Sequence, residues 1–573
     1  MTPAPATIWS LHFLATLVKL GVRDVVVSPG SRSQALAFAA YELSGHEAFD
    51  LDVHVAIDER SAGFLALGLS INTRVPTVLV CTSGSAPTHY LPAIVEAKHS
   101  GVPLIVVTAD RPRRLLGVGA NQATEQTGIF GQAVCQSDSV DLSAESDVRK
   151  DAPVRASGLF TGALSGANDG RAGAVHLNVH IDEPLSSEIG PEMLRELVPA
   201  DTSVTHQASP AEEIRRAVLD PQPGTVVVAG HGAGAEAALL AETLGAPLLA
   251  EVHSGARFGP HAVVAYRELL ADSPTIISRV VTVGRPTLSS QVAALLADES
   301  LEQVVWQRAE PEPANPTRAA RVVDLVESSR PATAEEIQSW VRPWLVASRE
   351  ITDQQAAVLD PPEPRVDLSA GDMKQRSEFA RHEMDVYRRR LTRREIAREV
   401  WEATWPHDQL VLGASRMIRE LDVVARGKNI PVWANRGLSG IDGTVATARG
   451  LGISSARSGL TGITRVLMGD LTLLHDAGSL LLDGEYEADA RVHLIVARDG
   501  RGSLFELLEA RSRASADAFN RVIATPAGID IEALAKAYGW DYRRVKTLGE
   551  LAAALMESAN HLIIDCEVEE TTA

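Results

Sequence analysis

Cysteine is scarce in this chain, and the few cysteines form no metal or disulfide pattern. Cys81, Cys135 and Cys566 lie far apart in the sequence, and no Cys-x-x-Cys pair occurs. A zinc ribbon and a disulfide-stapled secreted scaffold are therefore both excluded. The expected compartment is a reducing cytoplasm.

Aromatic residues and long apolar runs are also in short supply. Phe, Trp and Tyr make up only 4% of the residues, which argues against a surface that stacks single-stranded nucleic acid. No run reaches the roughly 18 apolar residues that a transmembrane helix needs, so none is expected. The first residues carry no basic segment, and the apolar stretch 11–20 predicts an amphipathic helix, not a signal peptide.

Basic residues are fewer than acidic residues in this chain. Lys and Arg number 54 against 74 Asp and Glu, which gives a formal net charge of −20. Because such a chain repels nucleic acid and anionic membranes, neither is an expected partner. The hydrophobic fraction of 45% is that of a globular protein. At about 150 residues per domain, the 573 residues correspond to roughly two to four domains.

Short apolar runs that end in small or polar residues recur along the first third of the chain. They occupy 25–28, 53–57, 77–81 and 104–108. Runs of this kind, separated by helical patterns, are typical of parallel strands that helices cover on both faces. Ligands of such sheets gather at the carboxyl ends of the strands. The loops after these runs are therefore the first places to look for chemistry.

The same pattern restarts near Gly224 and again near Leu391. We therefore predict an α/β fold of three doubly wound parallel-sheet domains, over residues 1–190, 200–365 and 385–573. The stretch 310–390 is rich in proline and charge, and predicts a linker that carries surface helices and no core. The glycine loop 231–234 lacks the pattern Gly-x-Gly-x-x-Gly, so a nicotinamide dinucleotide is not expected there.

Two acidic residues follow neighbouring predicted strands in the last third of the chain. Asp470 comes after Gly469 at the end of one strand, and Asp499 follows the next, 29 positions further on. That separation is one strand–helix–strand unit, so both carboxylates can reach one spot. Two oxygen ligands beside glycine suit a site for Mg²⁺ and a diphosphate. A helix cap at Asp470 and a plain turn at Asp499 would fit the same pattern.

This spacing resembles the fingerprint of thiamine-diphosphate enzymes, in which Gly-Asp is followed later by Asn or Asp. Such enzymes also need a glutamate on a separate domain, which hydrogen-bonds the aminopyrimidine ring and promotes loss of a proton from the thiazolium carbon. Glu59, which follows the predicted strand 53–57 and opens a helix of small residues, is the candidate. Burial would raise the pKa of such a glutamate toward working pH. A first-turn glutamate that complements the helix dipole would look the same.

Further short segments widen the resemblance. In chain order they are Ser28-Pro29-Gly30-Ser31-Arg32-Ser33, Asp58-Glu59-Arg60, Thr82-Ser83-Gly84-Ser85, Ala109-Asp110-Arg111-Pro112, Gly119-Ala120-Asn121-Gln122, Ala414-Ser415-Arg416-Met417-Ile418-Arg419, Asn435-Arg436-Gly437, Ser439-Gly440-Ile441-Asp442-Gly443 and Gly469-Asp470-Leu471. Together they closely resemble the 2-succinyl-5-enolpyruvyl-6-hydroxy-3-cyclohexene-1-carboxylate synthase family, thiamine-diphosphate enzymes of menaquinone biosynthesis. The resemblance covers residues 1–135 and about 410–510, and elsewhere only the general layout.

The resemblance implies a fold of the thiamine-diphosphate enzyme type and a carboligase reaction. The first domain would bind the pyrimidine, the central one would be Rossmann-like, and the last would bind diphosphate and Mg²⁺ or Mn²⁺. The family decarboxylates 2-oxoglutarate on thiamine diphosphate and adds the succinyl semialdehyde carbanion to isochorismate. In this family the glutamate domain of one subunit faces the diphosphate domain of another. The resemblance therefore implies a homo-oligomer, a dimer at least, with a tetramer as the larger alternative.

Motif position within the resemblance also implies residue roles. They are catalysis for Glu59; cofactor binding for Glu59, Ser415, Ile441, Gly469 and Asp470; 2-oxoglutarate binding for Arg419 and Arg436; isochorismate binding for Ser31, Arg32, Arg111 and Gln122; and metal binding for Asp470, Asp499 and the carbonyl of Arg501. Arginine suits both substrates because its fork of donors matches carboxylates. Each arginine would equally suit an ion pair, and Ile441 an ordinary core.

Two segments depart from the family pattern. Arg498 and Arg501 flank the second metal segment, which in relatives is rich in asparagine and glycine. Ser289 and Ser290 stand where relatives often have basic residues toward isochorismate, and Arg285 would have to compensate. These departures keep two alternatives open: another thiamine-diphosphate decarboxylase or carboligase, and a degenerate paralogue without catalytic activity.

Overall fold

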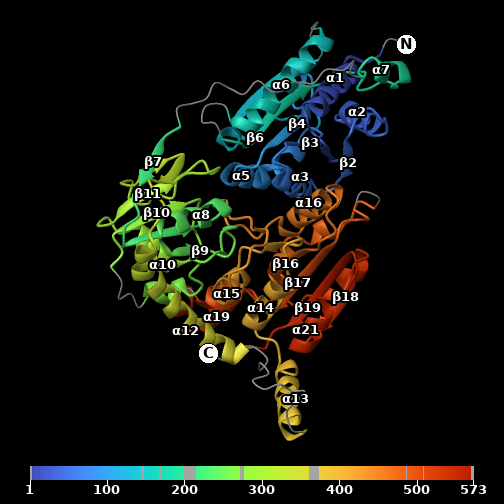
Figure 1. Cartoon of the computed structure of the whole chain (residues 1–573). Coiled ribbons are helices and arrows are strands. Elements are labelled where there is room, and N and C mark those ends of the chain that lie inside the picture. Colours follow the sequence, from blue (N-terminus) through green and yellow to red (C-terminus); the bar gives the residue numbers. More distant parts are fainter. Residues whose placement is uncertain are drawn as a thin grey trace. The chain divides into compact units, whose positions relative to one another are not determined.

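A computed structural model of the chain describes residues 3–142, 147–166, 171–198, 214–271, 276–359, 373–484, 487–507 and 509–569. Within these residues, helices alternate with strands, and the strands assemble into parallel sheets (Figure 1). The chain divides into two compact units. The first comprises Met1–Ala211, Asp442–Leu460 and Asp476–Ala490, and the second Glu212–Ile441, Thr461–His475 and Arg491–Ala573.

The first unit is built on a six-stranded parallel sheet in the order β2-β1-β3-β4-β6-β5. Its strands are β1 (Asp24–Val27), β2 (Asp52–Val55), β3 (Thr77–Cys81), β4 (Leu104–Asp110), β5 (Gln136–Asp141) and β6 (Ala174–His180). Its helices are α1 (Pro5–Leu20), α2 (Gln34–Ser44), α3 (Glu59–Thr73), α4 (Ala86–His89), α5 (Leu91–Ser100), α6 (Val148–Ser165), α7 (Pro191–Arg195) and α16 (Thr444–Arg457), with the short turns η1 (Arg113–Leu115), η2 (Gly131–Ala133) and η4 (Ala477–Leu480).

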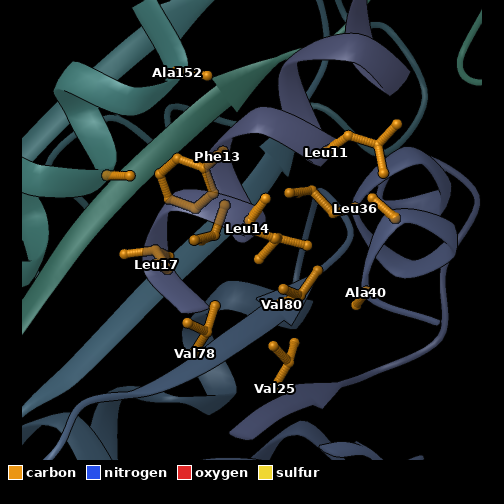
Figure 2. Packing of buried hydrophobic residues seen from close by; sticks show 14 of the residues in the cluster. Leu11, Phe13, Leu14, Leu17, Val25, Leu36, Ala40, Val78, Val80 and Ala152 are labelled. Carbon is orange, nitrogen blue, oxygen red and sulfur yellow. The ribbon is translucent and has the colours of Figure 1, made fainter. Parts of the chain in front are cut away.

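One face of this sheet packs under α1, α2 and α6. Phe13 and Leu14 of α1 meet Leu36 of α2 and the valines Val78 and Val80 of β3 (Figure 2). The two valines are two positions apart, so they point to the same face of the pleated strand. The helix predicted at 11–20 is confirmed as part of the longer α1.

The opposite face carries α3, and α16 packs against α3 at unusually short range. A Cβ built on Gly68 would lie 2.2 Å from the Thr447 carbonyl oxygen, and one on Gly450 2.3 Å from the Leu65 carbonyl oxygen. Only glycine permits this approach of two backbones. The Asp58 side chain caps α3 by accepting the Arg60 N–H at 2.8 Å. The helix is therefore fixed along its length and at its first turn.

The second unit contains a five-stranded sheet in the order β12-β11-β10-β8-β9, the pair β13-β7 and a six-stranded sheet in the order β15-β14-β16-β17-β19-β18, all parallel. Its strands are β7 (Arg216–Leu219), β8 (Thr225–Ala229), β9 (Leu248–Ala250), β10 (Arg279–Val283), β11 (Glu302–Trp306), β12 (Arg321–Val323), β13 (Leu325–Ser328), β14 (Gln409–Leu412), β15 (Val432–Trp433), β16 (Thr464–Gly469), β17 (Val492–Arg498), β18 (Asp541–Val545) and β19 (His561–Glu567). Its helices are α8 (Ala235–Leu244), α9 (Tyr266–Ala271), α10 (Ser290–Leu296), α11 (Ala334–Glu336), α12 (Arg342–Leu359), α13 (Met373–Tyr387), α14 (Arg393–Ala403), α15 (Arg416–Val424), α17 (Asp470–His475), α18 (Ala510–Arg513), α19 (Ala516–Phe519), α20 (Ile531–Ala537) and α21 (Leu548–Ala554), with the short turns η3 (Ile337–Val341), η5 (Ser503–Leu507) and η6 (Asn520–Ala524).

The prediction of a coreless linker over 310–390 is wrong for its first half. β12 and β13 lie in this stretch and pair with other strands. Trp340, Val341 and Trp344 are buried against Val226 and Val228 of β8. Their spacing of one, three and four positions marks one face of a helix, which the charge of the whole stretch conceals. α13 does present exposed side chains, as predicted, and 360–372 lie outside the described residues.

Parallel sheets flanked by helices confirm the predicted α/β class. The boundaries of the three domains stay a prediction. None of the helices that the structure describes combines the length and apolarity that crossing a membrane would require.

Candidate active site

The loops that carry the predicted residues of the first unit follow adjacent strands. The sheet order sets the ends of β2, β1, β3 and β4 side by side. Glu59 follows β2 and is half-buried, Ser31 and Arg32 follow β1, and Arg111 follows β4. The structure therefore brings these four residues to one edge of the sheet, where ligands of parallel sheets bind.

Two arginines at this edge carry N–H groups that nothing in the described chain accepts. Arg32 is 6% exposed, and its Nη1 donates to the Ile181 carbonyl at 3.0 Å. The buried Nε atoms of Arg32 and Arg111 have no hydrogen-bond partner among the described residues. Burial, together with the nearby cation of Arg111, lowers the pKa of Arg32. Two guanidinium groups placed together with spare donors make a site for an anionic ligand.

Gln122 is tied to the loop after β3. Its Nε2 donates to the Ser83 carbonyl at 2.9 Å, and its own carbonyl accepts from the Ser83 hydroxyl at 3.0 Å. Gln122 is exposed and adopts a positive φ of 57°, and Gly84 beside it has φ 95°. A Cβ on Gly84 would lie 2.7 Å from Cγ of Gln122. Glycine is therefore required where these two loops meet.

A pocket open to solvent lies in the second unit, at the ends of β16 and β17. Five residues of the sequence prediction line it: Ser415, Gly469, Asp470, Asp499 and Arg501. The other lining residues, to which the sequence analysis assigns no role, are Arg393, Arg416, Met417, Leu471, Thr472, Ala497, Gly502 and Ser503. Arg419, Arg436 and Ile441, which are also in the second unit, are not among the lining residues.

The two carboxylates of the pocket lie close enough to affect each other. Asp470 accepts the N–H of Leu471 at 2.8 Å and the N–H of Gly500 at 2.7 Å. Burial, and then the neighbouring charge of Asp499, raise the pKa of Asp470 to about 6. Two close carboxylates are unfavourable without a cation between or beside them.

The donor set of this pocket fits a Mg²⁺ ion held jointly with a diphosphate. No group of three or more His, Cys, Asp or Glu suited to a metal occurs in the described part of the chain. Mg²⁺ completes its coordination with water and phosphate oxygens, so two carboxylates suffice. The Arg501 carbonyl accepts the Ser503 N–H at 2.9 Å, which leaves one lone pair for a further contact.

A guanidinium that the sequence analysis missed pairs with one of these carboxylates. Arg393, the first residue of α14, donates through Nε to Oδ2 of Asp499 at 3.1 Å, and its Nη2 makes a second, shorter contact with the same oxygen. The other oxygen of Asp499 accepts the Arg501 N–H at 3.2 Å. The capping box of Thr392 and Glu395 marks the start of α14 in the sequence, but nothing there indicates where residue 393 points.

The two unexpected arginines of the second metal segment are occupied elsewhere. Arg498 Nε donates to Oδ1 of Asp565 at 2.7 Å. Arg501 Nη2 lies 2.9 Å from Oε1 of Glu506. Because a carboxylate neutralises each guanidinium, neither adds an uncompensated positive charge to the pocket.

We therefore expect Arg498→Asn to leave cofactor binding intact and to weaken the fold. The Kd of thiamine diphosphate with Mg²⁺, measured by calorimetry, should stay within about threefold of the unsubstituted chain. The free energy of unfolding should fall by on the order of 2 kcal/mol, because Asp565 stays buried without this guanidinium. Arg543→Gln, which removes a surface ion pair with Glu557, is the control. A tenfold change in Kd would contradict this account of Arg498.

The predicted 2-oxoglutarate arginines are held by the chain's own backbone. Arg436 is 2% exposed, and its Nη2 donates to the carbonyl of Thr287 at 2.8 Å. Arg419 Nη1 donates to the Ser415 carbonyl at 2.7 Å, and burial lowers the pKa of Arg419. Arg285 donates to the carbonyl of Gly437, next to Arg436. Arg285 thus braces the segment that carries Arg436.

The serines at 289 and 290 have a structural explanation. Ser289 caps α10 by accepting the Val292 N–H at 3.3 Å, and Ser290 donates its hydroxyl to the Gln291 side chain. The fully buried Glu251 accepts the backbone N–H groups of residues 287, 288 and 289, at 2.9, 2.7 and 3.2 Å. Burial is the main cause that raises the pKa of Glu251 to about 7. Ser289 and Ser290 therefore stabilise the conformation of this loop, and neither position carries a positive charge.

Ile441 lies half-buried in a sharply bent segment. Ser439, two positions before it, has φ 61°, and Gly443, two positions after it, has φ 63°. A Cβ on Gly443 would overlap the Phe64 ring, at 1.9 Å from Cγ. Only glycine fits at position 443, so the bend after Ile441 is fixed by that residue.

Comparison with known proteins places this geometry in context. Residues 10–131 match the family described as "Thiamine pyrophosphate enzyme, N-terminal TPP binding domain". The 2-succinyl-5-enolpyruvyl-6-hydroxy-3-cyclohexene-1-carboxylate synthase of Leifsonia xyli subsp. xyli (strain CTCB07) is 45% identical over 574 residues, covering 97% of this chain and 95% of that protein. The synthase of the same name from Clavibacter michiganensis subsp. michiganensis (strain NCPPB 382) is 43% identical and covers 97% and 94%.

A solved structure resembles the fold. The crystal structure of benzoylformate decarboxylase from Polynucleobacter necessarius superposes with a TM-score of 0.64 at 16% identity and covers 98% of both chains. At that identity the likeness concerns the arrangement of sheets and helices alone.

Proposed function

The chain belongs to the 2-succinyl-5-enolpyruvyl-6-hydroxy-3-cyclohexene-1-carboxylate synthase family, and on that premise we propose the reaction it catalyses. It is a thiamine-diphosphate-dependent transferase of menaquinone biosynthesis. It decarboxylates 2-oxoglutarate and transfers the remaining succinyl semialdehyde unit to isochorismate, which gives the product for which the family is named. The observation that carries the proposal is the meeting of Asp470 and Asp499 at adjacent strand ends in one pocket.

That pocket supplies the residues to hold the diphosphate and its cation. Asp470, Asp499 and the carbonyl of Arg501 hold Mg²⁺ or Mn²⁺, while Ser415 and Gly469 border the space for the diphosphate. Ile441 supports the cofactor from its bent segment. Thiamine diphosphate, when bound, supplies the carbon that attacks the 2-oxo group and takes up the electrons released with CO₂.

Glu59 is the acid–base residue of the proposal. It hydrogen-bonds the aminopyrimidine ring and holds the proton on the ring nitrogen. Its place in the first turn of a helix capped by Asp58, in the loop region after β2, fixes the backbone from which its carboxylate projects. A carboxylate positioned in this way exchanges a proton with a bound base over a hydrogen bond, without solvent.

Arginines bind the two anionic substrates. Arg32 and Arg111 have spare N–H groups for the carboxylates of isochorismate, and Ser31 and Gln122 lie in the same loops. Arg419 and Arg436 bind 2-oxoglutarate. A guanidinium that is already oriented by the backbone loses little freedom when it binds a carboxylate, so the clamps are preorganised.

Assembly and location complete the proposal. Glu59 lies in the first unit and Asp470 in the second. We propose a homodimer as the smallest active form, with the two residues contributed by different copies, and a tetramer as the larger form. We place the enzyme in the cytoplasm, since its three cysteines are free thiols.

The experiment that tests the function feeds the purified chain with 2-oxoglutarate and isochorismate, in the presence of thiamine diphosphate and Mg²⁺. We expect CO₂ and the succinylated product to form in equal amounts. Pyruvate serves as the matched alternative donor. Turnover of pyruvate without turnover of 2-oxoglutarate would favour another decarboxylase or carboligase. No metal-dependent cofactor binding would favour a paralogue that has lost catalysis.

A further inference from the structure

A fully buried polar network lies beneath the substrate loops of the first unit, and none of its core members has a role in the reaction proposed above. Thr108 and Asp110 of β4, Gln126 of the loop after β4 and Asn178 of β6 are all 0% exposed. Burying so many polar groups is costly unless every donor meets an acceptor. Hydrogen bonds fix the orientation of side chains and loops, which apolar packing does not. We therefore expect this network to hold the loops above it in one geometry.

The hydrogen bonds of the network fix the orientation of each amide. Asn178 donates through Nδ2 to Oδ2 of Asp110 at 2.8 Å. Its Oδ1 accepts from the Thr108 hydroxyl at 2.8 Å and from Nε2 of Gln126 at 3.0 Å. Because Asp110 can only accept when ionised, Asn178 cannot flip, and Gln126 must present its donor to Asn178.

From this fixed orientation the network reaches two loops. Gln126 accepts the N–H of Gly84, in the loop after β3, at 2.8 Å, and donates to the Ala109 carbonyl at 3.2 Å. Gly84 adjoins Ser83, whose backbone and side chain hold Gln122. The side-chain amide of Gln126 therefore connects the loop that holds Gln122 to the end of β4. Its oxygen bonds Gly84, and its nitrogen bonds Ala109.

The same network fixes the backbone of Arg111 from both sides. Asp110 Oδ1 accepts the Arg111 N–H at 2.7 Å, and the ring of His180 bonds to the Arg111 carbonyl at 2.7 Å. His180 is 0% exposed and lies 3.6 Å from Asp110. The peptide on each side of Arg111 is thus anchored, while its Nε is left for a ligand.

We propose that Gln126 and Asn178 are positioning residues, which set Arg111 and Gln122 at the separation that isochorismate requires. This inference rests on the function proposed above. It assigns the network to the second substrate alone, because no hydrogen bond of the network reaches Glu59 or the second unit in the described chain. A displacement of these loops should therefore weaken the acceptor step and spare the donor step.

The test compares two half-reactions in Gln126→Leu, which keeps the size of the side chain and removes its three hydrogen bonds, to Gly84, Ala109 and Asn178. Decarboxylation of 2-oxoglutarate is followed alone, with an artificial electron acceptor, and the full reaction is followed with isochorismate. We expect KM for isochorismate to rise about tenfold or more, with decarboxylation within about twofold of the unsubstituted chain. Ser70→Ala removes two buried hydrogen bonds with Thr77 at the opposite end of β3 and should change neither.

A second variant keeps the inference testable if the leucine variant does not fold. Gln126→Glu retains an acceptor for the Gly84 N–H and the same shape, but loses the donor toward Ala109 and Asn178. Because its new oxygen faces two other acceptor oxygens, the loops should again be displaced, and KM for isochorismate should rise without a change in decarboxylation. An unchanged KM, or an equal loss in both half-reactions, would overturn the positioning role. Failure of the unsubstituted chain to use isochorismate would instead overturn the proposed function.

Discussion

Glu59→Gln is expected to reduce product formation by about a thousandfold while thiamine diphosphate and Mg²⁺ still bind. Glutamine has the size of glutamate and can still accept a hydrogen bond, but it cannot take up or return a proton. Since Glu59 lies in the first unit, and the pocket of Asp470 in the second, the substitution leaves the diphosphate and metal ligands untouched. The loss should therefore fall on the rate and not on the Kd of the cofactor.

Single-turnover kinetics and calorimetry separate these two quantities. The Kd of the cofactor should stay within about threefold, and the rate of 2-oxoglutarate decarboxylation should fall with the overall rate. Asp58→Asn is the control, because Asp58 is adjacent and acidic but serves as the cap of α3, a role that asparagine also fills. A Glu59→Gln chain with a tenth or more of the original rate would remove Glu59 from the mechanism.

Asp470→Asn is expected to abolish metal-dependent cofactor binding without harm to the unliganded fold. Burial and the charge of Asp499 hold the pKa of Asp470 near 6, so its ionised form is strained by its surroundings. Removing the charge relieves that repulsion, which offsets the loss of one of the two hydrogen bonds that Oδ1 and Oδ2 accept from the N–H groups of Leu471 and Gly500. The cation, however, loses one of its two carboxylate ligands, which should weaken its binding by about a hundredfold or more.

Thermal unfolding with and without ligand distinguishes these effects. The unliganded variant should melt at or above the temperature of the unsubstituted chain. The rise in Tm that Mg²⁺ and thiamine diphosphate together produce should disappear, because a ligand stabilises only in proportion to its affinity. Asp541→Asn, an exposed acid at the start of β18, controls for the loss of one negative charge. A persistent ligand-dependent rise in Tm would show that the cation is held elsewhere.

The fold could be predicted from sequence where a strand is a continuous apolar run. The strand predicted at 77–81 is confirmed to the residue as Thr77–Cys81, since strands buried on both faces leave no polar interruption. The prediction fails at Trp340 and Trp344, whose helical face is diluted by charged neighbours. Average charge over a long stretch hides a short amphipathic pattern, and only the position of each apolar residue reveals it.

The residues of the candidate site also fall into two groups, those that could be predicted from the sequence and those that could not. Residues next to strand ends, Arg32 and Arg111 in one sheet and Asp470 in another, are accessible to sequence reasoning and to the family resemblance, because the topology of each sheet places its own strand ends side by side. Arg393 is not, since it comes from the start of a helix far away in the sequence and reaches Asp499 only through tertiary structure. Gln126 and Asn178 belong to the same class. A polar residue in a loop and another inside a strand give no sign in one sequence that they share a hydrogen bond.

The pairing of Arg498 with Asp565 has a consequence for how this segment can change over generations. Asp565 lies in β19, and its side chain is 3% exposed, so an asparagine at 498 would strand a negative charge in the interior. A neutral residue at 565 would in turn remove the shorter contact of Arg498 and leave its guanidinium with Glu567 alone, at 3.4 Å. We therefore expect a change at 498 to be tolerated best when residue 565 changes with it, since a change at 498 alone leaves Asp565 buried without this guanidinium.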